Sequence, residues 1–419
     1  MLDRKTPPPF NRSISFNLLQ PVTRTLPNGI PVHFISGGDQ DVIKIELILK
    51  AGRWFEQHWG ASYFACNLLS KGTQHKNSFA IAQIFDLYGA HLDVVSSFDY
   101  ASVALYCIGK QLKPVLDLML EVFTQPVFPE KEFAQSKDIY LQNLKVNQEK
   151  TSFLASKLIR KSLFGENHPY GKELDAADVT ALSRDKVLDF YKQFFSPFQI
   201  FVSGKINDTN EHLIIDAFSA LTKSAAPAVT NIPSKETFTP VYLEKQDSVQ
   251  TSIRLGRKSL ARLHRDYTDV LFLNHVLGGY FGSRLMKNIR EEKGLTYGIH
   301  SSLHPMMHDS FLLIGADVNK ENRELTIQEI KNELRTLRTE KISDDELDTT
   351  RYHFIGTLQT EITTPFAHAD KNKNIILNNL PGDYYSAMIN RIATITADDL
   401  LITAEKYFSE DTFIEASAG

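Results

Sequence analysis

The sequence contains only two cysteines, Cys66 and Cys107, among its 419 residues. Two cysteines cannot form the disulfide framework that holds small secreted domains together. No apolar stretch reaches the roughly 18 residues that a membrane helix needs, and the chain start lacks the apolar run of a signal peptide. We therefore expect a cytoplasmic protein that does not bind membranes; a periplasmic location stays open if a leader has been removed.

A strong charge of either sign is also missing. The formal net charge is −4, which gives no reason to expect nucleic acid or an anionic membrane as a partner. Hydrophobic residues make up 42% of the chain and charged residues 23%, as in ordinary globular proteins. A chain of this length exceeds one typical hydrophobic core, so we expect two or more domains.

Predicted strands and helices follow one another in blocks along the chain. The first hairpin is predicted at 22–25 and 30–35, around Asn28-Gly29, a pair that tolerates the positive φ angles of a tight turn. Alternating apolar residues predict further strands, and amphipathic stretches predict helices between them. Such blocks favour an α+β fold, an antiparallel-rich sheet with helices packed on one face.

The second half of the chain repeats features of the first. Residues 179–196 align with residues 392–409 at an offset of 213, and a predicted strand follows each copy. A coincidence between two amphipathic helices is the alternative. Residues 226–240 are rich in small residues and proline, as linkers often are. We therefore predict two similar domains, 1–225 and 241–419, joined by the linker 226–240.

The stretch 60–73 is predicted to form one helix that ends at a Lys-Gly pair. It resembles the zinc-binding helix of the pitrilysin/insulinase (M16) peptidases, Gly-x-Ala-His-x-x-Glu-His-x-Leu-x-x-Gly-Thr. By this resemblance Tyr63 and Asn67 replace the two histidine ligands, and Cys66 replaces the catalytic glutamate. The family's third ligand, a glutamate on a later helix, corresponds to Asn143.

These replacements remove the zinc chemistry. A zinc site needs three or four His, Cys, Asp or Glu ligands. Asn67 is a weak neutral donor, and Tyr63 would have to lose a proton with a pKa near 10. The thiol of Cys66 does not replace a carboxylate as general base. We therefore expect no metal and no catalytic residue in this motif; an enzyme with an unconventional metal site is the least favoured alternative.

A second segment, 282–298, keeps the family's residues. It resembles the second-half M16 motif Ser-Arg-Leu-x-x-x-x-Arg-Glu-x-x-Gly-Leu-x-Tyr, and Arg290 and Tyr297 occupy its Arg and Tyr positions. In the family these two residues face the zinc site across a chamber, so the resemblance implies a role in substrate binding. The alternative is that Arg290 pairs with a neighbouring glutamate and Tyr297 is an ordinary strand aromatic.

The resemblance covers nearly the whole chain. It implies two homologous M16-type (LuxS/MPP-like) domains arranged as a clam shell, and a non-catalytic subunit of the M16B type. The expected partner is a zinc-bearing M16 homologue, and the pair would form a peptide-degrading chamber. Arg290 and Tyr297 would then bind extended peptide and stabilise the oxyanion, while the cofactor, zinc, would belong to the partner. Self-association, and a purely structural or peptide-binding scaffold with no role in proteolysis, are the alternatives.

Overall fold

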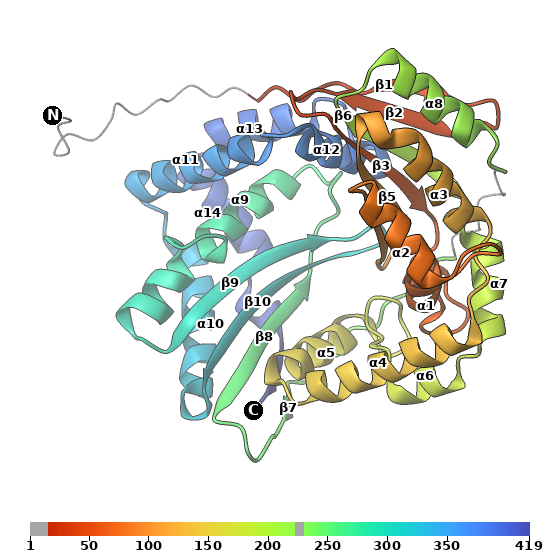
Figure 1. The fold of residues 1–419 in the computed structure, drawn as a ribbon. Coiled ribbons are helices and arrows are strands. Elements are labelled where there is room, and N and C mark those ends of the chain that lie inside the picture. Colours follow the sequence, from red (N-terminus) through yellow and green to blue (C-terminus); the bar gives the residue numbers. More distant parts are fainter. Residues whose placement is uncertain (1–15, 223–229) are drawn as a thin grey trace, which may run out of the picture.

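The computed structural model describes residues 16–222 and 230–419, so part of the predicted linker 226–240 lies outside the described residues. The chain forms two open sheets, each with its own helices (Figure 1). This arrangement confirms the predicted α+β architecture of two similar halves.

The first half carries a six-stranded sheet in the order β1-β2-β6-β3-β5-β4. Its strands are β1 (Val22–Thr25), β2 (Pro31–Ser36), β3 (Val42–Leu49), β4 (His91–Ser96), β5 (Ala101–Ile108) and β6 (Pro197–Gly204). Its helices are α1 (Ala61–Leu68), α2 (Ser78–Leu87), α3 (Leu112–Thr124), α4 (Glu130–Gln148), α5 (Thr151–Phe164), α6 (Ala176–Ala181), α7 (Arg184–Phe194) and α8 (Asp208–Ser219), with short 3-10 turns η1 (Arg53–Phe55) and η2 (Gly109–Gln111).

The second half carries a five-stranded sheet in the order β7-β11-β8-β10-β9. Its strands are β7 (Val241–Leu243), β8 (Gln250–Lys258), β9 (Thr296–Pro305), β10 (Ser310–Asn319) and β11 (Ile414–Ala418). Its helices are α9 (Tyr267–Gly278), α10 (Arg323–Thr339), α11 (Asp344–Glu361), α12 (Pro365–Leu377), α13 (Tyr384–Thr394) and α14 (Ala397–Tyr407), with the π-helix η3 (Met286–Glu292) and the 3-10 turns η4 (Lys320–Asn322) and η5 (Glu410–Thr412).

The strand order shows that the halves are repeats. The order β2-β6-β3-β5-β4 in the first sheet matches β7-β11-β8-β10-β9 in the second. In each sheet the first two strands of this shared order are parallel, namely β2 with β6 and β7 with β11. The aligned copies at 179–196 and 392–409 contain α7 and α14, each of 11 residues and each followed by a strand beside the sheet centre. The predicted repeat is therefore confirmed.

Each half also supplies one helix to the sheet of the other half. Alternate residues of β3, such as Ile45 and Leu47, face the core of the first half, whereas Ile48 points to the opposite face. On that opposite face Ile48 belongs to a cluster with Ala369 of α12, a helix of the second half. In the same way Ile159 of α5 packs against β8 and β11 in the second half. The two halves are therefore interlocked.

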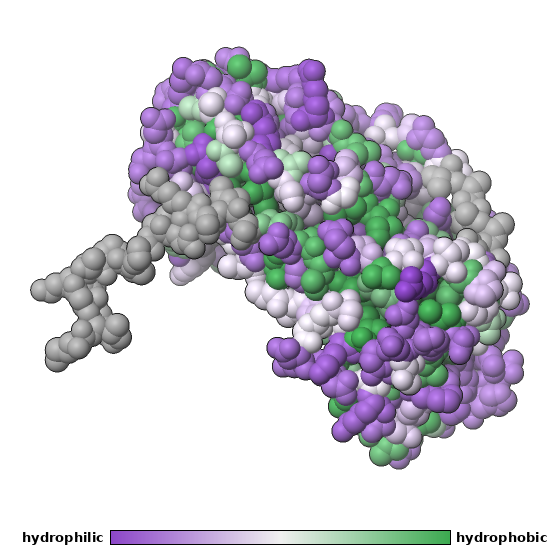
Figure 2. Space-filling model, turned by 90° about the horizontal axis from the view of Figure 1, so that it is seen from above, coloured by the Kyte–Doolittle hydropathy of each residue, from purple (hydrophilic) through white to green (hydrophobic). Residues whose placement is uncertain are grey.

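Polar contacts reinforce this joint. Lys373 of α12 donates to both carboxylate oxygens of Glu46 on β3, at 2.9 Å each. The Tyr170 hydroxyl donates to Asp99, and the Asp99 carboxylate accepts the backbone N–H of Met307 at 3.1 Å. These contacts join the halves into a clam shell. Viewed from above, its surface is mostly hydrophilic around the edge, with hydrophobic patches nearer the middle (Figure 2).

Some predicted elements differ from the structure. The helix predicted over 60–73 ends at Leu68, because Gly72 and Thr73 instead form single β-bridges with Asn77 and Pro126. The helices α6, α8 and α13 were not predicted. Of the helices in the described part of the chain, none is long and apolar enough to cross a membrane.

Candidate functional site

Helix α1 is fixed at its N-terminus by a carboxylate. Gly60 precedes the helix at φ = 92°, a conformation that favours glycine. The Glu56 carboxylate accepts the backbone N–H groups of Gly60 at 3.1 Å and Ser62 at 2.8 Å, donors that no helical carbonyl can satisfy. Burial raises the pKa of Glu56 to about 7, and the nearby Arg53 charge only partly opposes that shift. The start of α1 is therefore stabilised by hydrogen bonds to a side chain that lies outside the motif 60–73.

The three replaced positions of α1 do not fit a zinc ion. Burial raises the pKa of the Tyr63 hydroxyl, and the Asn67 side chain beside it lowers that pKa by less. Tyr63 thus stays protonated near neutral pH. Cys66 is buried in the core, and burial also raises the pKa of its thiol. A neutral phenol, an amide and a buried thiol do not make a zinc donor set.

The neighbouring helix α4 meets α1 through an aromatic side chain. The rings of Tyr140 and Tyr63 pack edge to face with centroids 5.1 Å apart, and the Tyr140 hydroxyl donates to the Leu174 carbonyl at 3.2 Å. Asn143, at the expected third ligand position, is exposed on α4. Across the described ranges, no three His, Cys, Asp or Glu side chains are grouped to hold a metal ion.

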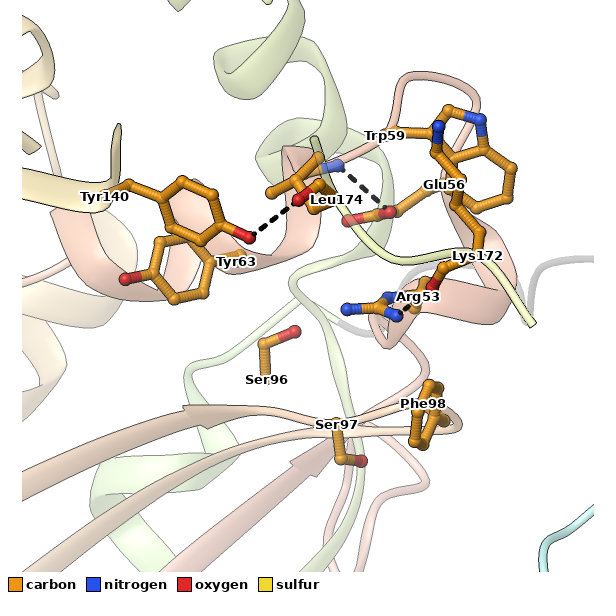
Figure 3. A pocket seen from close by; sticks show the side chains of 11 residues that line it. Arg53, Glu56, Trp59, Tyr63, Ser96, Ser97, Phe98, Tyr140, Lys172 and Leu174 are labelled. Atoms are coloured by element: carbon orange, nitrogen blue, oxygen red, sulfur yellow. Dashed lines mark hydrogen bonds between the residues drawn. The ribbon is translucent and has the colours of Figure 1, made fainter. Parts of the chain in front are cut away.

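A pocket of about 240 Å³ lies beside these tyrosines (Figure 3). Its walls come from η1, the start of α1, the β4–β5 turn, α4 and the segment after α5. The lining includes Arg53, Glu56, Tyr63, Phe98 and Tyr140. Sequence reasoning missed Arg53 and Glu56, since neither belongs to a motif and only the fold brings them to this helix.

Arg290 lies on the π-helix η3 of the second half. Its guanidinium covers the Phe281 ring with 4.5 Å to the centroid, a cation–π contact. Within residues 16–222 and 230–419, Arg290 forms no ion pair with a carboxylate, so the alternative of a neighbouring glutamate partner does not hold. The side chain is half-buried and its hydrogen-bond donors are available.

Tyr297 lies at a β-bulge at the start of the edge strand β9. Ala316 pairs with Ile299 and Val318 with Thr296, so two residues of β9 oppose one of β10. A bulge changes the direction in which a side chain points. Tyr297 is 95% exposed, which excludes the alternative that it is an ordinary packed strand aromatic. The Tyr297 side chain is therefore accessible to solvent.

The motif helix and the Arg/Tyr segment remain separate in this chain. All the described residues that line the pocket beside Tyr63 belong to the first half, and none comes from η3 or β9. Among the described residues, one half therefore has a pocket without a grouped set of metal ligands, and the other carries Arg290 on η3 and Tyr297 on β9, the end strand of its sheet that Figure 1 labels.

Comparisons with known sequences agree with the repeat. Residues 35–174 match the family described as Insulinase (Peptidase family M16), and residues 181–352 match the Peptidase M16 inactive domain. An uncharacterized zinc protease of Bacillus subtilis is 26% identical over 361 residues, 84% of this chain and 86% of the relative. An uncharacterized zinc protease of Rickettsia felis is 25% identical over 402 residues, 92% of this chain and 95% of the relative.

Solved structures share the whole fold. A crystal structure of a peptidase M16 inactive domain from Pseudomonas fluorescens is 25% identical, covers 96% of this chain and 98% of its own, and has a TM-score of 0.88. A protease from Helicobacter pylori is 18% identical and has a TM-score of 0.86; the match covers 96% of this chain and 100% of that chain. At this identity the similarity concerns the fold alone.

Proposed function

Because this chain belongs to the M16 peptidase family, we propose that it is a zinc-free subunit that pairs with a zinc-bearing M16 homologue. The two subunits form a peptide-degrading chamber. One observation carries the proposal: helix α1 lacks a zinc donor set, while Arg290 and Tyr297 match the family's motif and Tyr297 is 95% exposed. In a subunit without its own metal site, Arg290 and Tyr297 can contribute to catalysis if they act on the active site of another chain. In this proposal the chain is no enzyme on its own, and its location is the cytoplasm.

The chemistry of the two side chains supports this role. A guanidinium presents a planar fork of N–H donors that fits the carbonyl oxygens of an extended peptide. A phenol can donate a hydrogen bond to the oxygen that gains negative charge when a peptide carbonyl is attacked. Arg290 therefore holds the substrate chain, and Tyr297 stabilises the oxyanion in the partner's active site.

Extended peptide binds along the sheet edges. β4 and β9 are end strands of the two sheets, so within the described part of the chain one side of each has backbone groups without a strand partner. A peptide that adds as a further strand satisfies these groups. The exposed and half-buried side chains that alternate along β4 leave this edge accessible.

Co-purification tests the pairing. This chain is mixed with an M16 homologue that has an intact His-x-x-Glu-His motif, and peptide cleavage is compared with the homologue alone. We expect a stable complex and faster cleavage, and we expect Arg290→Ala to abolish the gain. The matched control is Arg265→Ala, because the side chain of Arg265 is 85% exposed and lies outside the motif.

Two results would contradict the proposal. Cleavage by the mixture no faster than by the homologue alone favours a scaffold without a role in proteolysis. A stable complex of two copies of this chain, with no affinity for the homologue, favours self-association.

A further inference from the structure

The pocket beside Tyr63 contains a cation whose hydrogen-bonding capacity is largely unused. One terminal nitrogen of Arg53 donates to the Lys172 carbonyl at 2.7 Å, and the guanidinium packs over the Phe98 ring with 5.0 Å to the centroid. A guanidinium carries five N–H donors. Throughout the described ranges Arg53 has neither an ion pair with a carboxylate nor a second side-chain hydrogen bond.

The other charges around the pocket are already engaged. Lys172 pairs with Asp178 at 2.7 Å and with Asp175 at 3.3 Å. Arg160 pairs with Glu173. The carboxylate of Glu56 accepts the two backbone N–H groups that begin α1. Among the described residues that line this pocket, Arg53 is therefore the cation that is left with donors for an anion.

The shape of the pocket indicates which kind of molecule can carry the anionic group. Tyr63, Tyr140 and Leu174 form an apolar and aromatic wall, and the volume of about 240 Å³ suits one large side chain rather than a long segment. Ser96, the last residue of the edge strand β4, and the following Ser97 border the same space. Figure 3 shows the Arg53 guanidinium between Leu174 and these serines.

We propose that this pocket binds the C-terminal carboxylate of a peptide, with Arg53 as its partner and the last side chain against the tyrosines. A peptide that lies along β4 ends at Ser96 and Ser97, where its terminus enters the pocket. The inference rests on the proposed binding of extended peptide to this chain. It assigns the remnant of the zinc site a role in recognising peptide ends.

Two peptides of identical sequence test the inference on the unaltered chain without a partner subunit. Both are acetylated at the N-terminus and carry a fluorophore there; one ends in a free acid and the other in an amide. Hydrogen bonds between charged groups are about twice as strong as neutral ones, so we expect the free acid to bind about ten-fold more tightly or better in fluorescence anisotropy. Equal affinity for the two peptides, or no binding of either, overturns the inference.

Variants of Arg53 test whether this residue causes the preference for the free acid. Arg53→Gln should lower the affinity for the acid to that of the amide, whereas Arg265→Gln should leave the difference unchanged. Arg53→Lys keeps the charge but not the planar fork, and should keep only part of the preference. Preference for the acid without faster cleavage in the mixture would contradict the proposed pairing and leave this inference standing. Faster cleavage in the mixture together with equal affinities for the acid and the amide would support the proposed pairing and overturn this inference.

Discussion

Glu56→Gln gives a quantitative test of how the remnant helix is stabilised. The folded chain holds Glu56 at a pKa of about 7, against an ordinary value of 4.5. The folded state therefore binds more protons than the unfolded state between these pH values, so the protonated carboxyl stabilises the fold at low pH. That stability is lost as the pH rises through about 7. The difference in pKa corresponds to roughly 3 kcal/mol.

Solvent screening at this open pocket lowers that figure, so we expect a loss of about 2 kcal/mol. Glutamine cannot ionise and still accepts one backbone N–H. Relative to Glu56→Gln, the unaltered chain should therefore lose about 2 kcal/mol of unfolding free energy between pH 5 and pH 8.5. Urea denaturation of both proteins at the two pH values measures it, with Glu405→Gln on the exposed face of α14 as control. A difference that stays constant with pH would refute the reasoning.

Two further predictions concern the metal site and the joint between the halves. The double variant Tyr63→His/Asn67→His should not retain stoichiometric zinc after gel filtration, because Asn143, and not a carboxylate, stands at the expected third-ligand position on α4. Elemental analysis measures the zinc content, and one zinc per chain would be the contrary result. Lys373→Met should lower the unfolding free energy by about 2 kcal/mol, because it removes an ion-pair partner of the buried Glu46. Urea denaturation measures the change. An unchanged midpoint would show that the pair does not contribute to stability.

Much of the fold could be predicted from the sequence, because the relevant signals are local. Amphipathic stretches predicted most of the helices, and the aligned copies predicted the repeat that the two strand orders display. The exchange of α5 and α12 between the halves could not be predicted. It depends on which face of a distant sheet is left uncovered, and periodicity along one helix does not contain that information.

Some residues of the candidate site could likewise be predicted from the sequence, and others could not. The motif residues Arg290 and Tyr297 were identified from sequence, and their role stays a prediction. The bulge that exposes Tyr297 could not be foreseen, since it arises from a register shift against β10. Arg53 and Glu56 gave no signal, because their importance follows from contacts with α1 and with the segment after α5.

The most direct test of the central claim is the turnover of a complex that contains Tyr297→Phe. This change removes only a hydroxyl from a side chain that is 95% exposed, so the stability of the chain should not change. Loss of one oxyanion donor typically costs about 10²–10³ in kcat. We therefore predict that the complex with the zinc-bearing homologue forms normally but cleaves peptide about 100-fold more slowly, with KM little changed. A complex of unaltered kcat would contradict the claim that this chain completes the active site of its partner.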